Sequence, residues 1–228
     1  MKRLVGKLIF GLSLLYCFVS CGLDVFYILE PPVFIRTSVG DDATNRYYIF
    51  RTQEVANMVA EYQDIFLGTE IYYKLYNSRT SLQSDIAGIS SSNTANSQNG
   101  ADRMISSLNY QKMMLHNTPQ EILIERTGVN REIELRLYRE GEKTEKEDDI
   151  KPYFRIDGVD MGIPMRYNNK PFDDVDEFNG SDVDSATGDS RDKWYINAYA
   201  VSTGMNTELQ TFYSQVVHLG EIEVDKKY

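Results

Sequence analysis

The residues best suited to chemistry lie in an acidic stretch of the C-terminal third. Residues 174–181 (DVDEFNGS) and 182–189 (DVDSATGD) form a tandem repeat in which acidic side chains alternate before a glycine. This arrangement can present several oxygens to one hard cation, as Ca²⁺ requires. The weak calcium candidates are Asp174, Asp176, Asp182 and Asp184. The fifth repeat position, a ligand in an EF-hand, holds Phe178 or Ala186. We therefore expect a solvated, extended, repulsive excursion and no firm metal site.

Other groups give little support for catalysis. His116 is expected to end a helix, where the dipole favours a cation, and His218 to be a hydrogen-bonded histidine within the last strand. Two His and two Cys cannot supply the usual N and S ligands of a zinc site. Residues 88–90 (GIS) lack the closing Gly of a nucleophile elbow. Carboxylates are too abundant for a glycosidase pair to stand out. We predict a non-enzymatic protein without a cofactor.

The N-terminal 20 residues have the pattern of an export signal. Lys2, Arg3 and Lys7 precede an apolar run over residues 8–19 (LIFGLSLLYCFV). This run is shorter than the roughly 20 residues that span a bilayer. The pattern predicts a removed signal peptide over residues 1–20.

The sequence at the end of this signal is Phe18-Val19-Ser20-Cys21-Gly22. It resembles the lipobox of bacterial lipoproteins, in the relaxed form seen in spirochaetal lipoproteins, with Phe18 where Leu is usual. The resemblance implies that Cys21 becomes the first residue and carries a diacylglyceryl thioether and an acylated amine. Cys17 is the weaker candidate because Tyr16 is too bulky to precede the cleavage site. The alternative is cleavage by the general signal peptidase, which would leave an unusual lone thiol in an oxidising compartment.

Processing at Cys21 changes the charge and the chemistry of the chain. The mature protein would have 208 residues; with three of 24 basic and none of 34 acidic residues removed, its formal charge changes from −10 to −13. That charge and the lack of a basic block exclude a nucleic-acid partner. No pair of cysteines remains for a disulfide. Residues 21–32 are expected to be the lipid attachment site and a short tether, which places the domain close to a bacterial cell or outer membrane.

Aromatic residues give a second signal. The chain contains 16 Tyr, and strand alternation places Tyr72, Lys74 and Tyr76 on one face. Tyr195, Asn197 and Tyr199 likewise share a face. Two interpretations are open. The faces could be covered by insertions, or the four tyrosines could be ligand-facing and stack on a protein or glycan.

The elements that would position these residues are mainly β-strands. Strands are predicted over residues 33–38, 47–52, 70–76, 132–138, 153–156, 194–201 and 212–224. Residues 122–124 and the turn at 127–130 are predicted to form a hairpin with the strand at 132–138. Asp102 is predicted to cap a helix that Asn117 and Pro119 end, and a second short helix is predicted over residues 54–62.

Three polar segments are predicted to be loops. Residues 90–100 (SSSNTANSQNG) contain one small apolar side chain and are expected to be mobile. Residues 139–149 are charged throughout, and residues 173–192 are strongly acidic. We interpret them as insertions, around 84–118, 139–150 and 173–192, into a single domain spanning residues 33–228.

Three strands carry a resemblance to a known fold. Residues 68–76 (GTEIYYKLY) are similar to the third strand of fibronectin type III domains, residues 194–202 (WYINAYAVS) to the sixth, and residues 212–217 (FYSQVV) to the last. The Trp that the family has in its second strand is absent here. The resemblance implies an antiparallel β-sandwich, of fibronectin III or immunoglobulin type, with long insertions and one or two short helices. Such a scaffold does not specify a function.

These observations predict a membrane-anchored envelope lipoprotein, periplasmic or surface-exposed, whose β-sandwich binds a protein or glycan ligand. The alternatives are a structural component of the envelope or a carbohydrate-binding module.

Overall fold

A computed structural model of the chain describes residues 27–37, 47–59, 62–95, 97–116, 121–137, 152–172, 178–186 and 193–225. The expected signal peptide, Cys21, the charged segment 139–150 and the candidates Asp174 and Asp176 lie outside the described residues. Residues 27–32 precede the first strand as an irregular segment.

One antiparallel sheet contains five strands of the described chain, in the order β1-β2-β7-β8-β9. Its strands are β1 (Val33–Thr37), β2 (Tyr47–Arg51), β7 (Glu132–Arg136), β8 (Tyr153–Ile156) and β9 (Val159–Gly162). The first four confirm predicted strands: β7 was predicted from side-chain alternation, and β1 and β2 from their β-branched and aromatic residues. Asp157 and Gly158, both with positive φ, turn the chain from β8 into β9.

The second sheet is built around two long strands. β3 (Phe66–Tyr76) and β12 (Lys193–Met205) pair antiparallel through most of their length. The shorter strands of the described part attach to these two: β4 (Gln111–Lys112), β6 (Ile124–Glu125) and β11 (Val183–Asp184) to β3, and β13 (Thr211–Tyr213) and β14 (Val217–Asp225) to β12. A separate small ladder joins β5 (Met114–Leu115) to β10 (Pro164–Met165).

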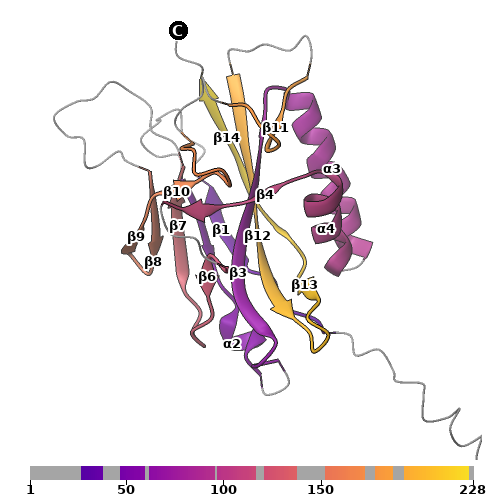
Figure 1. Ribbon diagram of the computed structural model, residues 1–228, viewed down its shortest axis with the longest axis vertical. Coiled ribbons are helices and arrows are strands. Elements are labelled where there is room, and N and C mark those ends of the chain that lie inside the picture. The colour runs from indigo at the N-terminus through magenta and orange to yellow at the C-terminus, as the bar shows by residue number, and fades with distance from the viewer. Residues whose placement is uncertain are drawn as a thin grey trace, which may run out of the picture.

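The main hydrophobic core lies between the two sheets, so the predicted mainly-β, sandwich-like fold is confirmed. Figure 1 shows the five-stranded sheet on one side of β3 and β12, and helices on the other. The core side chains of β3, Ile71, Tyr73 and Leu75, pack with those of the facing sheet. Both faces of β3 and β12 are covered, and their residues are almost all buried. The face toward the first sheet is apolar or aromatic, whereas the helix-covered face combines tyrosines with the buried polar residues Glu70, Lys74 and Asn197.

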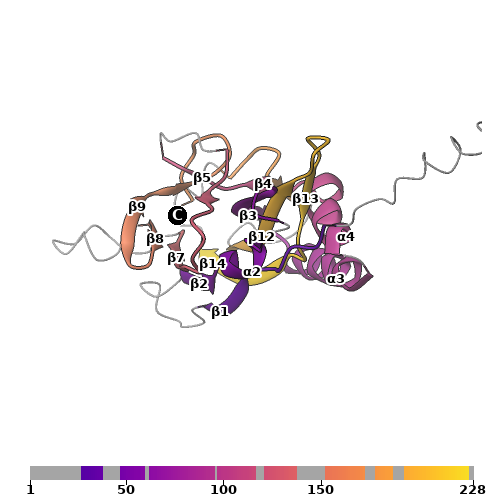
Figure 2. The same ribbon diagram turned by 90° about the horizontal axis from the view of Figure 1, so that it is seen from below.

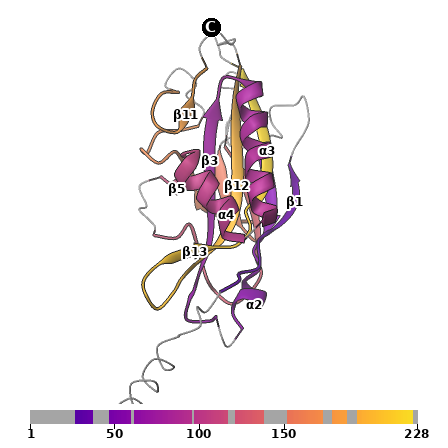
Figure 3. The same cartoon turned by 90° about the vertical axis from the view of Figure 1, so that its right-hand side faces the viewer.

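The helical layer differs from the prediction. α3 (Arg79–Ala95), α4 (Ser97–Asp102) and the single π-helical turn η2 (Arg103–Ser107) lie against β3 and β12 (Figure 3). The segment 90–100, predicted to be a mobile loop, therefore lies largely in helices. Leu82 and Ile89 pack on the sheet, and the Asn93 amide bonds the backbone of Val216 in both directions. Tertiary contacts therefore stabilise a helix that the polar sequence of this segment did not predict.

The helix predicted after Asp102 also ends early. Asp102 is the last residue of α4 and makes no side-chain cap for the turn that follows. Asn109 adopts φ 63°, a left-handed conformation that stops a helix. The chain then runs as β4 and β5, so His116 follows a strand rather than a helix and the dipole role predicted for it is wrong. The second predicted helix is confirmed only as the short α2 (Glu54–Asn57).

Two strand predictions need correction. β6 pairs with β3, whereas β7 pairs with β2 and β8, so the predicted hairpin over residues 122–138 instead crosses between the two sheets. The last predicted strand is divided into β13 and β14, because Ser214 bonds the backbone of Ser202 through both its N–H and its hydroxyl. In the described residues no helix is long and apolar enough to cross a membrane.

Candidate functional site

The predicted aromatic faces are brought together by the register of β3 and β12. Tyr195 lies opposite Tyr76, and Tyr199 lies opposite Tyr72. The two sets, predicted separately, therefore form a single face of the second sheet. The physical reason is the two-residue period of a strand, which keeps alternate side chains on one side along the whole pair.

This face is not open to a ligand. The exposed fractions of Tyr72, Tyr76, Tyr195 and Tyr199 are 6%, 0%, 8% and 2%. Side chains of the helical layer and Tyr110 cover them. The interpretation that insertions cover the aromatic face is the one the structure supports, and the four tyrosines are core residues rather than ligand-facing ones.

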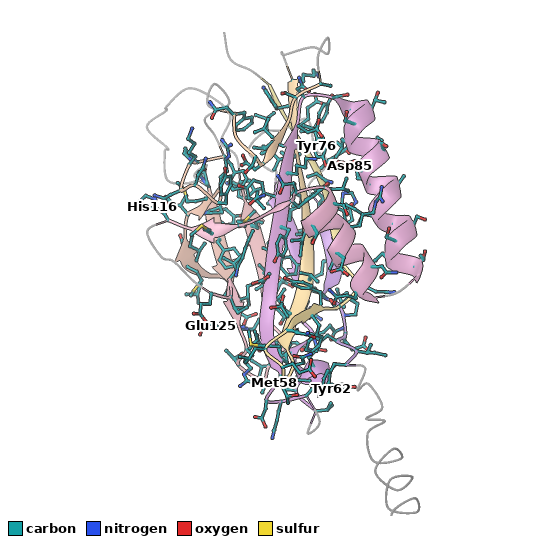
Figure 4. The ribbon with its side chains drawn as sticks, turned by 45° about the vertical axis from the view of Figure 1, so that its right-hand side comes forward. Met58, Tyr62, Tyr76, Asp85, His116 and Glu125 are labelled. Carbon is teal, nitrogen blue, oxygen red and sulfur yellow. The ribbon has the colours of Figure 1, made fainter. Side chains whose placement is uncertain are left out.

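A chain of buried polar groups runs between the covered face and the helices. The Tyr76 hydroxyl donates to Asp85, 2.8 Å away (Figure 4). The same hydroxyl lies 2.9 Å from the Tyr110 hydroxyl. Because the single Tyr76 proton goes to the carboxylate, the Tyr110 hydroxyl donates to Tyr76. The Asn197 amide donates to Tyr110 (2.7 Å), and its oxygen lies 2.6 Å from Nε2 of His218. Burial raises the pKa of Tyr76 and Tyr110 above the usual value for tyrosine.

His218 confirms the prediction of a satisfied sheet histidine. It lies in β14, with its ring 4.8 Å from the Tyr199 ring. Burial lowers its pKa to about 4, so the imidazole is neutral at pH 7 and donates its Nε2 proton to Asn197. At the other end of this series of hydrogen-bonded groups, the Lys74 ammonium lies 3.4 Å from Asp85 and 3.1 Å from Asp184. The arrangement ties the sheet to α3 and explains why polar residues alternate with tyrosines in these strands.

Asp182, one of the calcium candidates, forms a buried ion pair with Arg166. The Asp182 carboxylate binds Arg166 in a two-pronged contact, with N–O distances of 2.7 and 2.8 Å, and both side chains are fully buried. Asp182 also accepts a hydrogen bond from Tyr73 (2.9 Å). Burial alone would lower the pKa of Arg166, but the hydrogen bonds and charge of Asp182 raise it. A Cβ at Gly180, where φ is +123°, would lie 3.1 Å from Asp182, which favours glycine there.

The calcium candidates therefore do not converge on one ion in the described part of the chain. Asp182 bonds Tyr73 on the face of β3 that lines the core, whereas Asp184 bonds Lys74 on the opposite, helix-covered face. No group of three or more His, Cys, Asp or Glu side chains is placed to hold a metal among the described residues. The expectation that the acidic stretch is solvated is wrong for Asp182, which is buried and paired.

A third polar cluster holds one end of the sandwich. The buried Glu54 carboxylate accepts hydrogen bonds from Arg131 (2.6 and 2.9 Å) and from the backbone N–H groups of Thr127 (2.5 Å) and Gly128 (3.0 Å). It joins α2 to the connection between β6 and β7. Sequence reasoning missed this carboxylate, since nothing local distinguishes it from the many exposed acidic residues.

One exposed feature of the described residues is an apolar edge strand. β1 is an edge strand, and Val33, Phe34 and Ile35 in it have exposed fractions of 45%, 43% and 41%. Within the described residues β1 forms strand pairing with β2 alone, but β14 also packs close to it, and the Thr37 hydroxyl bonds the Leu219 carbonyl of β14. The extra residue at Ile35 forms a β-bulge. The sequence predicted a strand here but not that it is an exposed edge; the run of three apolar residues directly after Pro31-Pro32 was the available signal.

Comparisons with protein-family models, curated proteins and solved structures found no match to this chain.

Proposed function

We propose that this chain is an envelope lipoprotein anchored through Cys21, whose β-sandwich binds a protein partner and carries out no catalysis. The observation that carries the binding proposal is the apolar edge strand β1. Edge strands expose unpaired backbone groups, and soluble proteins usually protect them with charge or cover them. Here Val33, Phe34 and Ile35 are exposed together, and Arg36 is the charged residue that follows.

An extended segment of a partner protein suits this edge. It would add its backbone hydrogen bonds to β1, and its alternate side chains would cover the exposed apolar groups. A glycan partner has less support, because the four tyrosines predicted to stack on a ligand are buried under the helical layer. The bulge at Ile35 limits the length over which an added strand would keep regular pairing.

The anchor is tested by metabolic labelling with radioactive palmitate in the producing bacterium. The wild-type protein should be labelled, and Cys21→Ala should abolish the label while Cys17→Ala retains it. Persistent labelling of Cys21→Ala would refute lipidation at this residue.

The binding edge is tested by photo-crosslinking in intact cells. A photoreactive phenylalanine analogue replaces Phe34, and the matched control places it at Val159, which is 63% exposed in the other edge strand, β9. We expect a discrete protein adduct from position 34 that Ile35→Lys in the same chain abolishes, because the charge blocks strand addition. Adducts of equal yield from position 159, or none from position 34, would contradict the proposal.

A further inference from the structure

One end of the domain collects exposed aliphatic side chains from four separate segments. We call it the basal surface and define it by Ile28, Val55, Val59, Val129 and Leu209, whose exposed fractions are 62%, 57%, 46%, 57% and 78%. They come from the segment before β1, from α2 and the residues after it, from the β6–β7 connection and from the β12–β13 turn. Figure 1 shows α2 and the β12–β13 turn at the same end of the molecule, and Figure 2 looks onto that end.

Contacts among these segments hold the basal surface together. The Asn57 amide bonds both the N–H and the carbonyl of Glu30, which fixes the segment before β1 on α2. The Val55 N–H donates to the Asn130 side chain, 2.9 Å away, and Glu54 binds the same connection from the inside. The exposed aliphatic groups are therefore presented by an ordered framework.

Aromatic side chains border the basal surface. Tyr27, Tyr62 and Phe212 form a partly exposed group, with Tyr27 stacked on Phe212 at 5.4 Å and edge-on to Tyr62 at 6.1 Å. Rings with an apolar body and a polar hydroxyl favour the boundary between lipid headgroups and acyl chains. The combination of aliphatic tips and bordering tyrosines matches the chemistry of that boundary.

The length of chain between the domain and Cys21 places a bilayer next to this end. Six peptide steps separate Cys21 from Tyr27, and a fully extended chain of that length reaches about 21 Å. Tyr27 lies beside the basal surface through its contacts with Tyr62 and Phe212. Acyl chains attached at Cys21 would hold the basal surface within that distance of the lipid.

We propose that the basal surface docks on the bilayer that holds the Cys21 acyl chains, and so orients the domain with this end toward the membrane. The inference rests on the proposed lipid anchor and adds the contact surface. Exposed acidic residues near this surface, Asp64, Glu125 and Glu208, make attraction to anionic lipid unfavourable. Docking is therefore driven by the aliphatic side chains and needs only zwitterionic lipid.

The test uses the full-length lipidated protein, reconstituted into phosphatidylcholine vesicles with or without brominated acyl chains. Val129→Trp places a fluorophore on the basal surface, and the control Val159→Trp places one at a similarly exposed position in β9, at the side of the molecule away from α2 (Figure 2). Both variants share the buried Trp194 as a constant background. We expect brominated lipid to quench most of the emission added at position 129 and none of that added at position 159.

Vesicle flotation separates the two proposals. If the chain is anchored, the parent protein and both variants float with the vesicles; if none floats, the lipid anchor itself is refuted. If all float but position 129 is quenched no more than position 159, docking of the basal surface is refuted while the anchor stands. Leu209→Trp, at the most exposed position of this surface, repeats the measurement if Val129→Trp fails to fold.

Discussion

The buried Arg166–Asp182 pair gives the sharpest quantitative prediction. Both side chains are fully buried, and two N–O contacts of 2.7 and 2.8 Å join them. In Asp182→Ala the guanidinium stays inside the protein while its carboxylate partner is gone. Removal of one member of a buried pair costs roughly 3–5 kcal/mol. With a urea dependence of about 2 kcal/mol per molar, the unfolding midpoint should fall by about 1.5–2.5 M.

The fluorescence of Trp194 provides the assay. This residue is the single tryptophan of the chain; its ring packs 5.4 Å from Phe178, four residues before Asp182. Replacement of both partners, Arg166→Met with Asp182→Leu, removes the buried charges together. Its expected cost is about 1–3 kcal/mol, because the Tyr73 hydroxyl still loses its acceptor.

A solvent-exposed ion pair serves as the control. Arg51 and Glu132 lie 3.8 Å apart, with side chains that are 55% and 51% exposed. Glu132→Gln should cost about 0–1 kcal/mol. If Asp182→Ala lowers the midpoint no more than Glu132→Gln, or if the double replacement is as damaging as Asp182→Ala, the argument from burial is refuted.

Two further predictions concern pH and backbone conformation. Burial lowers the pKa of His218 from 6.5 to about 4. As the pH falls, the unfolded chain therefore takes up the proton before the folded protein does. The free energy of unfolding should decrease as the pH falls from about 6.5 to about 4. The unfolding midpoint of His218→Gln should depend less on pH across that range than the midpoint of the wild-type protein. An equal pH dependence of the two proteins would contradict this prediction. At Gly68, where φ is +151°, an added Cβ would lie 2.2 Å from the Ile124 carbonyl oxygen, so Gly68→Ala should cost about 2–4 kcal/mol. Gly158→Ala, with φ +81° and nothing within 4 Å, should cost about 1–2 kcal/mol in the same denaturation experiment, and equal costs would refute the steric argument.

Side-chain alternation correctly predicted two strands that line the core. In residues 132–138 and 194–201 the apolar side chains recur at every second position, and the structure places them in the core between the sheets. The same period correctly grouped Tyr72 with Tyr76 and Tyr195 with Tyr199. Alternation is a local property of a strand, so it can be read without knowledge of the partner strand.

The errors fall where a distant contact decides the local structure. α3 continues through Ser90 and Ser91, which have weak helix propensity, because the end of this helix is held by Asn93 on Val216. β6 joins β3 rather than β7, and its connection to β7 is held by Glu54. The fibronectin type III resemblance stays a prediction, as do the lipid anchor and the partner.

The sequence by itself determined most of the longer strands, the shared faces of the tyrosines, the charge, and the residues on which the expected export and lipidation depend. These follow from side-chain period, composition and short motifs. Only the tertiary structure decided that helices cover the tyrosines, that Asp182 pairs with Arg166, and that the exposed apolar groups lie along β1 and at the basal surface. Each of these depends on segments far apart in the chain. Whether a side chain is buried is decided only when the layers pack together, so it cannot be read from one segment alone.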